Sequence, residues 1–215
     1  MTYINLVNAV LRKLREDEVS TLTETDYSKL VGDFVNDALT SVEASWDWSC
    51  LRETITVTTT QGVKDYSLSG FGNSSELMYM YDVTNKNQLV LQSKAYIDDK
   101  HYRGTGVEAN PKDFCMKGVD GNGDMKIILY PIPSTQLTLE ASVARRGVQL
   151  VNDNDSTLLP RLPIVQYAFA YALRERGETG GQSASEQLVI AQRDLSNAIA
   201  LDAGNNANEL VFIAV

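Results

Sequence analysis

The sequence predicts an α+β fold: a bundle of about four helices, two N-terminal and two C-terminal, with an inserted small antiparallel β unit and an extended C-terminal tail. Apolar residues recur at helical spacing near both ends of the chain, and β-branched residues alternate with polar ones in its middle third. A polar hinge then precedes a strongly apolar last segment. We expect a helical body from residues 1–50 and 157–204, a β unit from 51–156 and a docking tail from 205–215.

Two amphipathic helices are predicted at the N-terminal end. The first covers about residues 3–15, with its apolar side chains on one face. The second begins near Asp26, where Thr23 and Asp26 have the spacing of a capping box. Its apolar stripe continues for about six turns to Trp46, which predicts a helix roughly 30 Å long.

The pattern changes after residue 51 to one that is typical of strands. In Thr54-Ile-Thr-Val-Thr every residue is β-branched, hydroxyl side chains alternate with apolar ones, and turn residues follow. A short helix or turn fits residues 95–102. The remaining strands are predicted near residues 65–69, 76–83, 88–92, 113–116, 125–130 and 136–144. Together they indicate a small antiparallel unit.

The C-terminal helices are predicted from residues 164–176 and from about residue 183 to residue 204. Pro163 suits the first position of the earlier helix, whose apolar residues cover nearly its whole circumference and indicate burial on most sides. Ser183 and Glu186 have capping-box spacing at the start of the later helix. Its inner face is predicted to carry Leu188, Ala191, Leu195, Ala198 and Ile199.

Composition excludes several classes of protein. The 215 residues are 43% hydrophobic and 22% charged, as in an ordinary globular protein, and the formal net charge is −9. Bulk charge would therefore repel nucleic-acid phosphates and anionic membranes. We expect no membrane span, no signal peptide and a reducing compartment. Two cysteines and one histidine cannot supply a four-ligand zinc site, so we expect no metal and no cofactor.

Catalytic constellations are weak in this sequence. His101 has the chemistry of a general base, with Asp98 or Asp99 as its orienting group, but the surrounding segment is polar and lacks a nucleophile motif. We interpret His101 as a surface residue and expect that the protein is not an enzyme. Asp120-Gly-Asn-Gly-Asp is interpreted as a turn, not as a calcium loop, and Cys50 and Cys115 as thiols near the core.

Small basic spots occur at Arg145-Arg146 and around Arg12, Lys13 and Arg15. The second spot lies near the end of the first predicted helix, where cations offset the helix dipole. We interpret both spots as solvated or capping side chains, and they do not indicate base-specific recognition of nucleic acid.

The C-terminal tail is the most informative segment. Its large apolar residues are Leu210, Val211, Phe212, Ile213 and Val215. Such a segment would promote aggregation if it were exposed in a monomer. It either folds back as an edge strand of its own β unit or docks into a partner, by strand addition or in an apolar groove. Burial of five such side chains contributes about 7–15 kcal/mol before ordering costs, so we predict that they form an interface with a partner chain or a neighbouring copy.

Three segments carry a family resemblance. They are NLVNAVLRKLREDEVSTLTETDYSKLVGDFVNDALTSVEASWDWSCLRETITVTT, LPRLPIVQYAFAYALRERGE and AQRDLSNAIALDAG. They resemble head-to-tail adaptor proteins of tailed bacteriophages, also called connector, tail accessory or tail tubular A-type proteins. The resemblance covers the order of helices and strands over most of the chain.

The resemblance implies a virion protein of the neck, assembled in the host cytoplasm into a ring that is commonly a dodecamer. The ring would lie beneath the portal protein, extend the DNA channel and bind the downstream tail or nozzle protein. DNA would pass through the lumen without sequence-specific binding. In this family the C-terminal segment typically reaches toward the portal, in agreement with the predicted docking tail.

Other interpretations stay open. The chain has features compatible with another phage neck or tail-completion protein in the same stack of rings. A stand-alone module that binds a ligand through its β unit would instead show a concave pocket with convergent polar groups, and would be a monomer.

Overall fold

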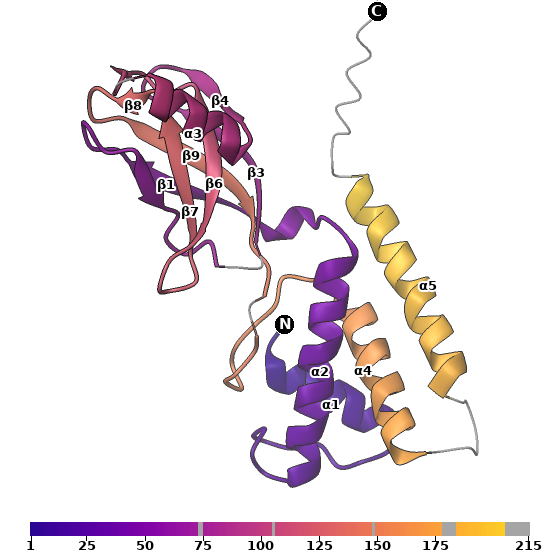
Figure 1. Ribbon diagram of the computed structural model, residues 1–215. Helices are drawn as coiled ribbons and strands as arrows, with labels where there is room; N and C mark the ends of the chain where they lie inside the picture. Colours follow the sequence, from indigo (N-terminus) through magenta and orange to yellow (C-terminus); the bar gives the residue numbers. More distant parts are fainter. Residues whose placement is uncertain (73–74, 105, 148, 178–183, 205–215) are drawn as a thin grey trace, which may run out of the picture. The chain divides into compact units, whose positions relative to one another are not determined.

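The computed structural model describes residues 1–72, 75–104, 106–147, 149–177 and 184–204. The chain forms two compact units, each with its own apolar core: Met1–Leu51 together with the chain from Val148 onward, and Arg52–Gly147 (Figure 1). We call them the helical unit and the β unit. None of the helices within the described ranges has the length and apolar character that a bilayer span requires.

The helical unit contains four α-helices in its described part. They are α1 (Tyr3–Lys13), α2 (Asp26–Ser45), α4 (Arg161–Arg176) and α5 (Ala184–Ala203). The first three pack on one another around a core of aliphatic residues, and α5 packs along α4. Trp48 is almost fully buried in this core, and its Nε1 donates a hydrogen bond to the Val42 carbonyl at 2.8 Å. The indole thereby closes the end of α2.

Two helix starts differ from the sequence prediction. The cap of α2 is Thr25, whose Oγ1 accepts from the Ser28 N–H at 2.9 Å while the Ser28 Oγ accepts from the Thr25 N–H at 3.2 Å. The predicted pairing of Thr23 with Asp26 is therefore wrong. Helix α4 begins at Arg161, so Pro163 lies inside the first turn, where no intrahelical N–H bond is lost. The predicted cap Ser183 lies outside the described residues.

The β unit contains a seven-stranded sheet in the order β1-β9-β3-β4-β6-β7-β2. Its strands are β1 (Arg52–Thr58), β2 (Asp65–Ser67), β3 (Glu76–Asp82), β4 (Asn87–Leu91), β6 (Asp113–Val119), β7 (Met125–Tyr130) and β9 (Thr138–Ala144). A second, two-stranded sheet pairs β5 (Glu108–Ala109) with β8 (Ile132–Pro133). Helix α3 (Lys94–Arg103) packs on β6 and β7 through the fully buried Ile97.

The fold class predicted from the sequence is wrong. The described residues form five α-helices and a large, curled, mixed sheet, instead of a four-helix bundle with a small antiparallel unit. The mixed character arises because β4 pairs with β6 in parallel, and α3 forms the crossover that a parallel pair requires. The periodic signal for α3 is weak, since Ile97 is its single buried residue.

The cap of α2 provides a stability test. Thr25→Ala removes the acceptor for the Ser28 N–H, so we expect a loss of about 1 kcal/mol in the free energy of unfolding. Urea denaturation followed by circular dichroism measures this loss. Thr23→Ala is the matched control, because the Thr23 side chain is exposed, and it should change stability by less than about 0.5 kcal/mol. Equal losses in the two variants would contradict the assignment of the cap.

Candidate interaction surface

The seam between α4 and α5 combines buried polar residues with the apolar residues that the sequence predicted, since Leu195, Ala198 and Ile199 pack against the core of the helical unit. The buried residues of α5 are Gln187, Ala191 and Asp194. Of the five residues predicted for the inner face, only Ala191 is buried; the other four are half-buried. Burial of an amide and a carboxylate is favourable only where both are hydrogen-bonded. The partners of these groups therefore decide how α5 is held.

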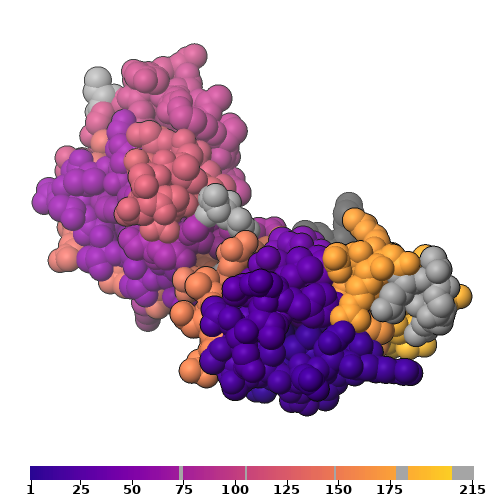
Figure 2. Space-filling view, turned by 90° about the horizontal axis from the view of Figure 1, so that it is seen from below, coloured from indigo at the N-terminus to yellow at the C-terminus, as the bar shows by residue number. Residues whose placement is uncertain are grey.

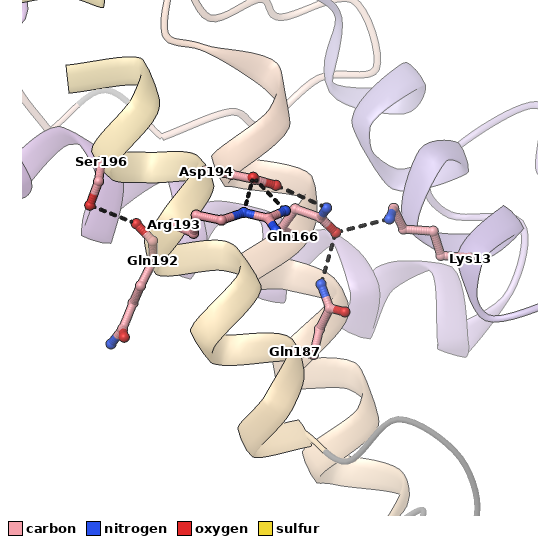
Figure 3. Close-up of polar contacts among 7 residues, drawn as sticks. All are labelled: Lys13, Gln166, Gln187, Gln192, Arg193, Asp194 and Ser196. Carbon is pink, nitrogen blue, oxygen red and sulfur yellow. Dashed lines mark hydrogen bonds and ion pairs between the residues drawn. The ribbon is translucent and has the colours of Figure 1, made fainter. Parts of the chain in front are cut away.

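The shared partner is Gln166 of α4, as Figure 3 shows. Its Nε2 donates to Asp194 Oδ2 at 3.1 Å, while its Oε1 accepts from Gln187 Nε2 at 2.8 Å and from Lys13 Nζ at 2.9 Å. The Arg193 guanidinium lies 3.2 Å from Asp194 Oδ1 and offsets the carboxylate charge. One side-chain amide thus links α1, α4 and α5.

An open groove of about 450 Å³ lies beside this network, between the end of α1 and the start of α4. Its lining is formed by Ala9, Arg12, Lys13, Arg161, Leu162 and Val165. The floor is apolar, and Leu162 is 54% exposed, in contrast with the buried apolar residues that follow it in α4. We call this feature the cationic groove.

Three cations surround the cationic groove. Arg12 Nη1 forms an ion pair with Glu18 at 2.8 Å, and Lys13 Nζ lies 5.3 Å from the centroid of the Phe169 ring. The Arg161 side chain forms no hydrogen bond or ion pair with any described residue. Cations around an apolar floor can hold an anionic group together with an adjoining apolar side chain.

The C-terminal end of α5 is fixed by a second polar contact. Asp202 Oδ2 accepts hydrogen bonds from Trp46 Nε1 at 3.0 Å and from the Ser49 N–H at 3.1 Å, and Asp202 Oδ1 accepts from Ser49 Oγ. These bonds hold the last turn of α5 against the segment that follows α2. The point from which the chain continues to residues 205–215 is therefore anchored.

The C-terminal end of α4 is held by its last residue, Arg176. Its Nε donates to the Tyr27 hydroxyl at 2.6 Å, and its Nη2 forms an ion pair with Glu16 at 2.6 Å. Figure 2 shows this side of the helical unit, where the indigo surface of the first residues adjoins the orange surface of α4. The polar contacts of the unit thus join its N-terminal and C-terminal halves.

The structure does not bring together the catalytic residues considered from the sequence. His101 Nε2 lies 3.2 Å from the Leu129 carbonyl oxygen, and its ring meets Tyr130 edge-on. Asp98 pairs with Lys94, and Asp99 pairs with Arg103. Both carboxylates are thus engaged along α3 by cations one turn away, and neither is bonded to His101.

The remaining sequence candidates have structural partners. Asp120 Oδ1 accepts from the N–H groups of Asn122 and Asp124, and these bonds lower the pKa of its carboxyl group, which suits a turn. Cys115 is buried, and burial raises the pKa of its thiol. Within the part of the chain that the structure describes, no cluster of three or more His, Cys, Asp or Glu side chains could hold a metal ion.

The predicted interface residues Leu210, Val211, Phe212, Ile213 and Val215 lie outside the described residues. The cationic groove was not predicted, although Arg12 and Lys13 were noted as a basic spot. Its third cation, Arg161, belongs to a segment far away in the sequence. The one local signal for the groove was Leu162. It is an apolar residue in the first turn of α4, and the residues that follow it already supply the apolar face that packs into the core.

The fold and these surfaces define a two-unit interaction protein: buried polar bonds hold its helices, and a groove is open to a partner. A family model described as SU10 adaptor protein matches residues 1–209. The chain therefore belongs to the SU10 adaptor protein family, and it is a structural adaptor protein of the bacteriophage virion that interacts with other phage head or tail proteins. No curated protein matches the chain.

The Gln166 network generates a second prediction. Asp194→Ala leaves the buried Gln166 Nε2 without its acceptor, so we expect a loss of about 1–3 kcal/mol in the free energy of unfolding, measured by urea denaturation. Asp194→Asn retains an acceptor oxygen and should lose less. Gln192→Ala, on the exposed face of the same helix, should change stability by less than about 0.5 kcal/mol. A loss at Gln192 as large as that at Asp194 would contradict the assignment.

Proposed function

We propose that this phage adaptor is a head-to-tail adaptor of the virion neck. It assembles in the host cytoplasm as a ring beneath the portal protein, extends the DNA channel and binds the downstream tail or nozzle protein. The observation that carries the proposal is the family match over residues 1–209, together with the resemblance of three segments to head-to-tail adaptors. The same resemblance supports a dodecamer.

The apolar residues 210–215 serve as the latch of this assembly. The segment contains no charged side chain, and its burial in a partner supplies the stabilisation that a permanent joint needs. It follows α5, whose last turn Asp202 anchors. We further propose that the protein has no catalytic role, because the Leu129 carbonyl engages His101 and the neighbouring carboxylates are paired with cations.

Assembly on the portal tests this function. The full chain is mixed with purified portal protein and viewed by negative-stain microscopy, and we expect a ring at one end of the portal. The variant Leu210→Ser/Phe212→Ser/Ile213→Ser should fail to form this ring, because the latch has lost its apolar side chains. Asn205→Ser/Asn206→Ser/Asn208→Ser, with three changes in the preceding hinge, is the matched control and should assemble.

Each outcome decides between functions. Absence of a ring with the full chain would overturn the head-to-tail assignment. Binding to an assembled neck, but not to the portal alone, would favour another neck or tail-completion protein. A ring formed by the serine variant would show that residues 210–215 are not the latch.

The negative net charge suits passage of DNA. A lumen that repels phosphate lets the genome slide, whereas a basic lumen retains it. We therefore expect slower genome ejection when acidic residues that face the bore of the assembled ring are changed to lysine. Ejection rates measured at several salt concentrations check this expectation, since screening should reduce the difference. Identical rates at low salt would contradict it.

A further inference from the structure

The two edges of the seven-stranded sheet differ in their protection against strand pairing. The β2 edge is only three residues long, and Asp65 at its start forms an ion pair with Lys117 at 2.8 Å. Short edge strands and charges are common devices against unwanted pairing. The β1 edge has seven residues, and its last five are the uncharged, β-branched Thr54-Ile-Thr-Val-Thr.

The outer side of β1 is open within the β unit. Strand β1 pairs only with β9 and stands at the end of the sheet order (Figure 1). Across the described ranges, no further backbone hydrogen bond reaches residues 53–58. Thr54, Thr56 and Thr58 are exposed on one face, and Ile55 is only half-buried against the core. An additional strand would pair the open backbone groups and cover Ile55.

Residues 209–215, Glu-Leu-Val-Phe-Ile-Ala-Val, have the properties of such a strand. They equal β1 in length, and they combine high β-propensity with low charge. The cationic groove is a poorer match, because its cations favour an acidic partner and Glu209 is the only acidic side chain among residues 209–215. The uncharged edge of β1 has no such preference.

We infer that residues 209–215 of one copy add as a strand to the β1 edge of a neighbouring copy. The inference rests on the proposed latch function of residues 210–215, and it identifies the surface to which they bind. The donated segment and the receiving edge are different surfaces, so each copy gives one strand and receives one. Contacts of this heterologous kind generate a ring when the rotation closes.

Cysteine cross-linking tests the inference in the full chain. The background is Cys50→Ala, and the fully buried Cys115 is retained. Chains with Thr56→Cys, at the centre of β1, are mixed with chains that carry either Phe212→Cys or Ile213→Cys. One of these two positions must share the face of Thr56, because side chains alternate along a strand. We expect disulfide-linked dimers with one of them. Asp65→Cys, on β2, is the matched control and should give none.

The outcomes separate this inference from the proposed function. Absence of a disulfide both in free protein and on the portal would overturn the inference, even where microscopy shows a ring. Equal cross-linking at Asp65 would also overturn it. A further variant carries both cysteines in one chain: Thr56→Cys together with whichever of Phe212→Cys and Ile213→Cys gave the disulfide. A cross-linked monomer from this chain, without dimers in the mixture, would show that the strand is added within one copy.

Amide hydrogen exchange gives a second readout that needs no cysteine. Strand addition should slow the exchange of the outward-facing amides in residues 53–58 of the assembled full chain. The variant Leu210→Ser/Phe212→Ser/Ile213→Ser should lose this protection, while the amides of β2 exchange alike in both proteins. Unchanged exchange at β1 would contradict the inference.

Discussion

The side-chain amide of Gln166 is the buried polar group that ties α5 to α4 and α1. Its oxygen accepts from α1 and α5, and its nitrogen donates to α5, in a position where water has little access. A buried amide requires partners in fixed directions, whereas an apolar contact tolerates sliding and rotation. The position of α5 along α4 is therefore set by hydrogen-bond geometry, with Asp202 defining its far end.

This polar seam has a consequence for the surface of α5. Because Gln187 and Asp194 occupy two of the three buried positions of α5, Leu188, Leu195 and Ile199 are only half-buried. Val189 and Leu201 are largely exposed, at 64% and 77%. Polar bonds thus hold α5 in place, and part of its apolar surface stays exposed. This pattern suits a protein of the adaptor family, whose members interact with other virion proteins.

The sequence predicted individual elements better than their assembly. The stripe that ends at Trp46 identified α2, and alternation identified β1, because both signals are local. Helix α3 was hard to recognise, and with it the parallel pairing of β4 with β6, since one buried residue gives no periodic pattern. The cationic groove depends on tertiary packing that brings Arg161 beside Arg12, and no local spacing predicts it. The phage adaptor class followed from the family resemblance, and the family match confirms it.

The anchoring of Asp202 also bears on how strongly copies would associate in the proposed ring. Trp46 and Ser49 hold the last turn of α5 through Asp202, so the described chain ends at a defined place in the helical unit. Only four residues, 205–208, separate this place from the proposed latch. Short linkers produce effective concentrations in about the millimolar range. In the proposed ring, each contact made after the first would in effect be intramolecular, so modest individual affinities would add up to a joint that dissociates very slowly.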